Sequence, residues 1–203
     1  MGRGRKKEFD REAALEAALG VFWELGFDGA SMPALVGRMG IGRQSLYDTF
    51  GDKRALYLAA LRRYATTRIG AVAGQLRAPG SAYGNLRRVL FRWIEMASNP
   101  DGHGCLVGNS LAALPEGDDD AGDILEAALS ELERAFVETV RRARIMGEIR
   151  PTVPDDELAA LLMTTGQGLA VVCRARADRA RAVRVVRSAL RALAPVDGAI
   201  FPD

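Results

Sequence analysis

Nearly the whole chain carries the pattern of amphipathic helices, and this pattern limits what it can fold into. Apolar residues recur at spacings of three and four, Ala, Leu, Arg and Glu dominate, and alternating β-branched runs are almost absent. Glycine, proline and helix-capping residues divide the sequence into segments of helical length. We therefore expect an all-α fold of about nine helices.

The capping residues set the expected helix boundaries. Asp10 is a candidate N-cap of the first helix, and Gly26 follows it where a C′ glycine belongs. Ser31 can cap the second helix, Gly40 ends it, and Asp52 can cap a long fourth helix. The expected helices cover about 10–25, 31–40, 43–49, 52–76, 81–97, 105–114, a start within 116–123 to 145, 155–174 and 178–193.

Charge is distributed unevenly along the chain. The whole sequence has 28 Lys and Arg against 26 Asp and Glu, a net charge of +2. Residues 1–63 have 11 basic and 8 acidic side chains, whereas residues 64–203 have 17 and 18. A basic first part on a nearly neutral remainder favours nucleic-acid contact at one end. Arg3 and its basic neighbours are expected to form an arm along DNA, which contains Arg3, Arg5, Lys6 and Lys7. Plain disorder of this segment is the equal alternative.

Other chemistry has little support. Two cysteines, Cys105 and Cys173, are too few for a disulfide framework and suit a reducing compartment. The single histidine and the wide cysteine spacing offer no metal site, and no phosphate-binding glycine loop occurs. The longest uncharged run, 158–173, is shorter than the ~20 residues of a membrane helix. We expect a cytoplasmic protein with no membrane partner that is not an enzyme, with no catalytic residue, cofactor or metal.

The strongest motif lies between Ser31 and Phe50, where two short predicted helices meet at Gly40. Gly40 permits a tight turn, and Leu46 anchors the second helix to the core, as in a helix-turn-helix. The second helix then presents one polar face, which fits the DNA major groove. That face contains Arg43, Gln44, Ser45 and either Asp48 or Thr49.

This stretch resembles the TetR/AcrR family of bacterial transcriptional regulators. The resemblance is dense over residues 9–63, and its residues are Leu35-Val36, Met39-Gly40-Ile41, Ser45-Leu46-Tyr47, Phe50-Gly51-Asp52-Lys53 and Leu56. It implies an N-terminal arm and helix-turn-helix DNA-binding domain over residues 1–52. A helical ligand-binding and dimerisation domain over residues 53–203 is implied to follow, with a connecting helix at about 53–76.

The resemblance and the side-chain chemistry assign the same DNA contacts. Arg43 is expected to read guanine and Gln44 adenine, each through a bidentate pair. Lys53 joins its charge to the positive N-terminus of the fourth helix, which makes a phosphate site. The expected DNA-binding residues are Ser31, Arg43, Gln44, Ser45, Tyr47, Thr49 and Lys53. The alternatives are a solvated helix face for Arg43 and Gln44, and core packing for Tyr47.

The resemblance also implies a homodimer that pairs the last two helices across a two-fold axis. The eighth expected helix has a wide apolar face that includes Leu158, Leu161, Leu162, Thr165, Leu169 and Val172. The ninth offers Ala182, Val185, Val186, Ala189, Leu190 and Leu193 between arginines. An intramolecular core is the alternative, and we expect each helix to serve both purposes.

The remaining candidates concern a signal that controls DNA binding. A small, mostly apolar effector is expected among helices five to eight. The candidate lining residues are Trp93, Met96, Cys105, Phe136, Met163 and Gln167. The alternative for these residues is ordinary core packing. Cys105 opens a helix after a glycine-rich loop, where a thiolate is stabilised, so oxidant or electrophile sensing competes with inert packing.

We therefore expect a regulator that binds operator DNA, with repression the expected mode and activation the alternative. It would leave the DNA when a small molecule binds or a thiol is modified. The rival class is a helical ligand-binding protein that does not act on DNA, which would not need the motif at residues 31–53.

Overall fold

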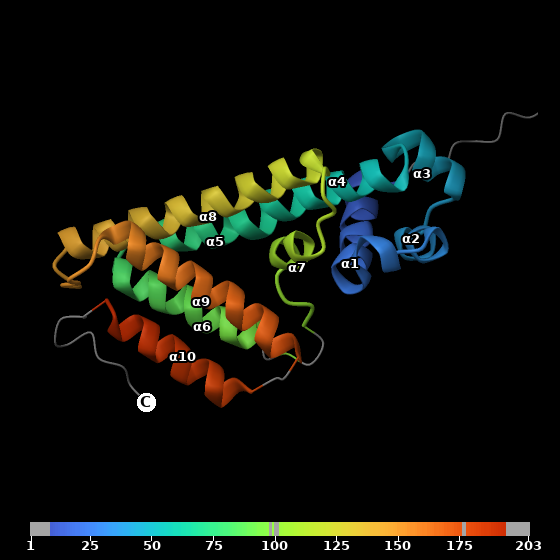
Figure 1. Ribbon diagram of the computed structural model, residues 1–203. Coiled ribbons are helices and arrows are strands. Elements are labelled where there is room, and N and C mark those ends of the chain that lie inside the picture. Colours follow the sequence, from blue (N-terminus) through green and yellow to red (C-terminus); the bar gives the residue numbers. More distant parts are fainter. Residues whose placement is uncertain (1–8, 98, 100–101, 176–177, 194–203) are drawn as a thin grey trace, which may run out of the picture. The chain divides into compact units, whose positions relative to one another are not determined.

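The computed structural model describes residues 9–97, 99, 102–175 and 178–193, and the elements of this part are helices (Figure 1). The first six are α1 (Arg11–Gly29), α2 (Met32–Met39), α3 (Arg43–Phe50), α4 (Lys53–Tyr64), the π-helical segment η1 (Ala65–Ile69) and α5 (Gly70–Arg77). The others are α6 (Ala82–Ala97), α7 (Leu106–Ala112), α8 (Asp119–Ile145), α9 (Asp155–Ala175) and α10 (Arg179–Arg191).

Helical residues follow one another without a break from residue 53 to residue 77. Counted with that run as one helix, the described part of the chain has nine helices. The all-α fold and the helix count that the sequence predicts are thus confirmed. Within this part of the chain, no helix is both long and apolar enough to cross a membrane.

The helix ends lie where capping chemistry predicts them. Oδ1 of Asp10 accepts hydrogen bonds from the backbone N–H groups of Glu12 (2.9 Å) and Ala13 (3.1 Å), so it caps α1. Gly26 interrupts α1 with φ of 71°, in the left-handed region that favours glycine. Ser31 caps α2, since its Oγ accepts from the backbone N–H of Ala34.

The chain divides into two compact units, Met1–Tyr64 and Ala65–Asp203. The sequence predicts the domain boundary between residues 52 and 53. In the structure, α4 belongs instead to the compact N-terminal unit. Packing is the reason, because α4 buries Leu56, Ala60 and Leu61 and packs along α1. A helix whose apolar side covers α1 folds together with it.

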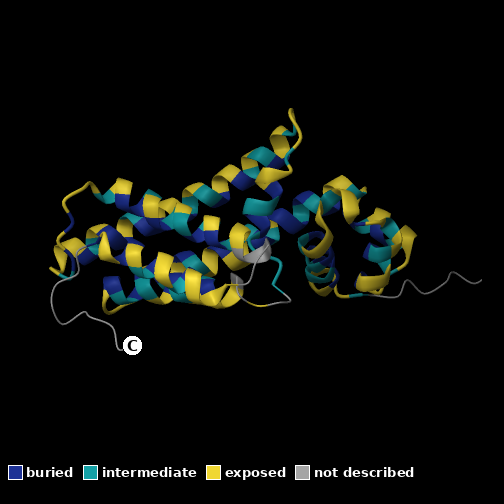
Figure 2. Cartoon of the chain, turned by 60° about the horizontal axis from the view of Figure 1, so that its bottom comes forward, coloured by how far each residue is buried: buried dark blue, intermediate teal, exposed yellow. Residues whose placement is uncertain are grey.

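Within the C-terminal unit, α8 packs against α5, α6, α7 and α9, and α6 also packs against α9 and α10 (Figure 1). Buried residues follow the inner sides of these helices and exposed residues the outer sides (Figure 2). The core consists mainly of aliphatic side chains and one phenylalanine, which include Leu86, Leu90, Ile94, Leu125, Leu132, Phe136, Val140, Leu158 and Leu162.

Hydrogen bonds fix the end of α5 to its neighbours. The guanidinium of Arg142 on α8 donates to the carbonyl groups of Arg77 (3.0 Å) and Ala78 (2.9 Å). The side-chain amide of Asn85 on α6 also donates to the carbonyl of Ala78, at 2.7 Å. These donors satisfy carbonyl groups that a helix end leaves without intrahelical partners. The last turn of α5 is therefore held by both α6 and α8.

Candidate nucleic-acid interface

Buried apolar side chains hold α2 and α3 as a helix-turn-helix. Leu35 on α2 and Leu46 on α3 are fully buried, and Gly40 makes the turn with φ of 67°. Phe50 at the end of α3 is also buried, and the guanidinium of Arg11 lies 5.2 Å from its ring centroid. One side of α3 is thus anchored in the core, and its other side faces solvent.

The exposed side of α3 contains most of the expected base-reading residues. Arg43, Gln44, Tyr47 and Asp48 are exposed, at spacings that share one face of a helix. Ser45 and Thr49 are half-buried at the edges of this face. The structure therefore brings the sequence-predicted residues of α3 together on one polar surface.

Lys53 begins α4, next to the end of α3. Its ammonium lies 4.6 Å from the ring centroid of Phe27, which is a cation–π contact. Oδ1 of Asp52 accepts from the backbone N–H of Ala55 at 2.7 Å and so caps α4. The contact of Phe27 with Lys53 could not be predicted from the sequence, because no short spacing connects the two residues. A lysine directed by an aromatic ring at a helix N-terminus is well placed to bind a phosphate.

Two other parts of the predicted DNA interface remain, Ser31 and the N-terminal basic arm. Ser31 is exposed, but its hydroxyl oxygen is used to cap α2. The basic arm of Arg3, Arg5, Lys6 and Lys7 lies outside the described residues.

The residues expected to line an effector site lie on the helices α6, α8 and α9 of the C-terminal unit and at the N-cap of α7. Trp93 of α6 contacts Phe136 of α8, with ring centroids 5.7 Å apart. The indole of Trp93 also packs directly on the backbone of Gly166 in α9. Oε1 of Gln167, also in α9, is buried and accepts no hydrogen bond from the described residues.

The other three candidates are Met96, Met163 and Cys105. Met96, near the end of α6, is 45% exposed, and Met163 on α9 is half-buried. Cys105 is half-buried at the N-cap of α7, after Gly104, whose φ is 71°. The structure thus joins Trp93 and Phe136 directly and leaves Met96 largely open to solvent.

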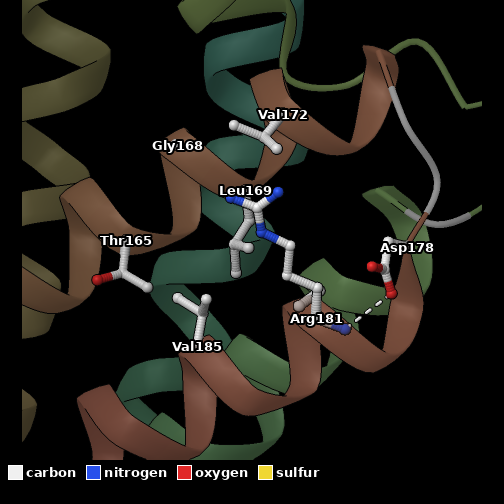
Figure 3. A pocket seen from close by; sticks show the side chains of 8 residues that line it. Thr165, Gly168, Leu169, Val172, Asp178, Arg181 and Val185 are labelled. Atoms are coloured by element: carbon white, nitrogen blue, oxygen red, sulfur yellow. Dashed lines mark hydrogen bonds between the residues drawn. The ribbon is translucent and has the colours of Figure 1, made fainter.

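A shallow apolar groove of about 330 Å³ lies between α9 and α10 (Figure 3). Its lining contains none of the six effector candidates and consists of Thr165, Gly168, Leu169, Val172, Asp178, Arg181, Ala182 and Val185. Leu169 and Ala182 are buried at its floor, whereas Val172 and Val185 are 46% and 40% exposed. The two helices therefore bury one side inward, as the sequence predicts, and leave a second apolar surface outward.

Comparison with known protein families agrees with this architecture. Residues 14–60 match the family described as bacterial regulatory proteins, tetR family. Residues 82–189, more than half of the chain, match the family described as the tetracyclin repressor-like C-terminal domain. The chain belongs to the TetR family of transcriptional regulators.

Two curated relatives match this TetR family protein over most of their length. It is 34% identical to the uncharacterized HTH-type transcriptional regulator YezE of Bacillus subtilis (strain 168), over 88% of this chain and 93% of that protein. It is 28% identical to the HTH-type transcriptional repressor ComR of Escherichia coli (strain K12), over 93% of this chain and 91% of that protein. These relatives are named as transcriptional regulators and not as enzymes.

A solved structure shows a similar TetR family protein with DNA. A cysteine-substituted variant of the regulator CifR, in complex with a 26-base-pair operator, matches this chain with a TM-score of 0.79 and 34% identity. The match covers 93% of this chain and 99% of the CifR chain. The family, the helix-turn-helix and the function as a DNA-binding transcriptional regulator are therefore confirmed.

Proposed function

We propose that this protein is a repressor that binds its operator with α3 in the major groove. The observation that carries the proposal is the exposed face of Arg43 and Gln44 on a helix anchored by the fully buried Leu46. Arginine pairs with guanine and glutamine with adenine at major-groove edges. Tyr47 and Lys53 flank these side chains and would hold the phosphate backbone, and Ser45 and Thr49 would add contacts at the edges.

The test is a gel-shift assay with the DNA upstream of the protein's own gene, at two salt concentrations and with unrelated competitor DNA. We expect retardation that weakens as salt rises, because neutralised phosphates release counterions. A reporter placed behind the same DNA should be less active when the protein is present. Absence of retardation at low salt would contradict the proposal and favour a helical ligand-binding protein.

A homodimer through α9 and α10 is the second part of the proposal. The outer surface of these helices includes Leu161, Val172 and Val185, which are 44%, 46% and 40% exposed. Gly168 in the groove of Figure 3 carries no side chain that would hold a partner helix away. Two copies joined there would place two α3 helices on one operator, and binding two half-sites raises affinity. This dimer would act in the cytoplasm, where it would meet its operator DNA.

An effector that releases the protein from DNA is the third part. Oε1 of Gln167 is a buried acceptor without a donor among the described residues, and a methyl group added to Gly108 of α7 would lie 3.0 Å from it. Buried acceptors normally have a partner, so an apolar molecule that carries an N–H or O–H group fits this place. A thermal-shift screen with such molecules tests the idea, since a ligand at 100 times its Kd stabilises a protein by about 2.7 kcal/mol. A hit should lose its effect in Gln167→Leu.

A thiol-based signal is a second candidate for the release mechanism. Cys105 is half-buried at the N-cap of α7, so part of this residue remains open to solvent. The loop before it is held by Asn109, whose side-chain amide donates to the carbonyl of His103 at 2.7 Å. Peroxide or an alkylating electrophile should then release DNA from the wild type and from Cys173→Ser but not from Cys105→Ser. Equal release from all three would contradict a role for Cys105.

A further inference from the structure

A carboxylate on α3 holds the side-chain amide of Gln44 in one orientation. Gln44 and Asp48 are exposed one turn apart, and Nε2 of Gln44 donates a hydrogen bond of 2.9 Å to Oδ1 of Asp48. An ionised carboxylate only accepts hydrogen bonds, so it binds the amide nitrogen and repels the amide oxygen. The contact therefore decides which end of the Gln44 amide turns toward Asp48.

This orientation decides which base edge the amide can meet. The amide nitrogen has two hydrogens, and when the one that points away from Oε1 is given to Asp48, the other remains beside Oε1. An acceptor oxygen next to an N–H donor is the pattern that pairs with N6 and N7 of adenine. The reversed amide would set a donor against the amino group of adenine and an acceptor against N7, so it would not pair.

We propose that Asp48 is a positioning residue for base recognition, which holds Gln44 in the orientation that selects adenine. This inference rests on the proposed function, because it needs α3 in the major groove. The competing role for Asp48 is direct recognition, since a carboxylate can accept from the N4 amino group of cytosine. The hydrogen bond to Gln44 favours the positioning role, because Oδ1 of Asp48 already accepts from a side chain of the same helix.

The experiment uses the full-length protein and a randomised double-stranded DNA library, from which bound duplexes are selected and sequenced. Gln44→Ala first identifies the base position that Gln44 reads. The preference for A·T at that position is then compared between the wild type and Asp48→Asn by competition binding. Asparagine keeps the shape of Asp48 but can either donate or accept, so it no longer fixes the amide of Gln44. We expect the A·T preference to fall about 2- to 10-fold, the factor that corresponds to one net hydrogen bond.

Asp48→Asn also removes a negative charge, which should strengthen binding to every DNA sequence alike. Asp28→Asn is the matched control, because Asp28 is exposed in the same unit and its replacement removes the same charge. It should raise affinity without a change in base preference. In a Gln44→Ala background, Asp48→Asn should leave base preferences unchanged, since no amide is left to orient.

Three results would overturn the proposal. They are an unchanged A·T preference in Asp48→Asn, an equal loss of preference with and without Gln44, and a Gln44→Ala variant that alters no base position. The second result would assign direct base reading to Asp48. All three leave the proposed function in place when the wild type still selects a sequence. A wild type that selects no sequence would overturn the proposed function together with this inference.

Discussion

At the scale of single residues, Arg43 and Lys53 should contribute to DNA binding in different ways. Arg43→Ala removes a bidentate pair, so we expect discrimination at one base position per half-site to fall by about 1–3 kcal/mol. Lys53→Ala removes a phosphate contact, so it should weaken all sequences about equally and reduce the salt slope by about 1. Competition binding at several salt concentrations separates the two effects.

The matched control for both variants is Arg150→Ala, which removes an exposed arginine from the C-terminal unit. It should change neither base preference nor salt slope by a comparable amount. If Arg43→Ala and Arg150→Ala behave alike, Arg43 does not read a base.

The same residues show what a sequence can predict at this scale. The polar face of α3 was predictable because residues one turn apart share a helix face, whatever surrounds the helix. The cap at Asp10 was predictable for the same reason, since a cap acts on the next few backbone N–H groups. The ring of Phe27 under Lys53 was not, because the contact depends on how α1 meets α4.

At the scale of elements, α9 needs a glycine where it passes Trp93. A methyl group added to Gly166 would lie 1.7 Å from Cζ3 of Trp93 and 1.9 Å from Cε3. The indole cannot easily move aside, because it packs on the fully buried Phe136. Gly166→Ala should therefore lower the free energy of unfolding by about 1–3 kcal/mol, measured by urea denaturation.

Gly74→Ala is the matched control for that substitution. Gly74 is exposed on α5 and nothing lies within 4 Å of an added methyl group, so alanine should stabilise by up to about 1 kcal/mol through helix propensity. Equal stabilisation by both substitutions would show that Trp93 does not pack on Gly166.

A second prediction at this scale concerns the ion pairs between α5 and α8. Arg77 donates to Glu138 (2.6 Å) and to Glu131 (2.5 Å), and these hydrogen bonds hold the pKa of both carboxyl groups below the ordinary glutamate value. A lowered pKa stabilises the folded state above the unfolded-state pKa, and this stabilisation is lost as pH falls through the folded-state value. The wild type should thus lose stability below about pH 4.5.

The size of that effect is small, because the three side chains are between 33% and 52% exposed. Solvent screening limits each pair to less than about 1 kcal/mol. Arg77→Gln should therefore lose less stability than the wild type between pH 6 and pH 3 in urea denaturation, and Arg150→Gln should behave as the wild type. Parallel curves for all three proteins would exclude this contribution of the ion pairs.

The π-helical segment η1 shows a pattern that the sequence analysis did not use. Between residues 61 and 76 of the helical run from α4 to α5, the buried positions are Leu61, Tyr64, Ile69, Ala73 and Leu76. Steps of three or four residues keep one face of an α-helix, but the step from Tyr64 to Ile69 is five. The wider π turn returns Ile69 to the buried side. The five-residue step between apolar positions thus indicates the π turn in the sequence. In the structure, η1 packs against α8.

At the scale of the whole molecule, the roles of the two units follow from the surfaces that each unit exposes to solvent. In the N-terminal unit the exposed surface includes the polar face of α3, whereas in the C-terminal unit it includes the apolar side of α9 and α10. Helix propensity and apolar spacing were enough to predict both surfaces. The wall of Trp93, Phe136 and Gly166 was beyond them, because three helices distant in sequence meet there.

The outward apolar surface of α9 and α10 gives the last prediction, which concerns assembly. Leu161→Asp would place a charge on a side chain that the partner subunit buries in the proposed homodimer, and an unpaired buried charge strongly opposes association. Sedimentation equilibrium should then show a monomer for the variant and a dimer for the wild type. DNA affinity should fall with it, because a monomer reaches only one half-site. Ile145→Asp is the control, because Ile145 is 79% exposed at the end of α8, outside the α9–α10 surface. If both variants stay dimeric and bind DNA as the wild type does, the subunits pair through another surface.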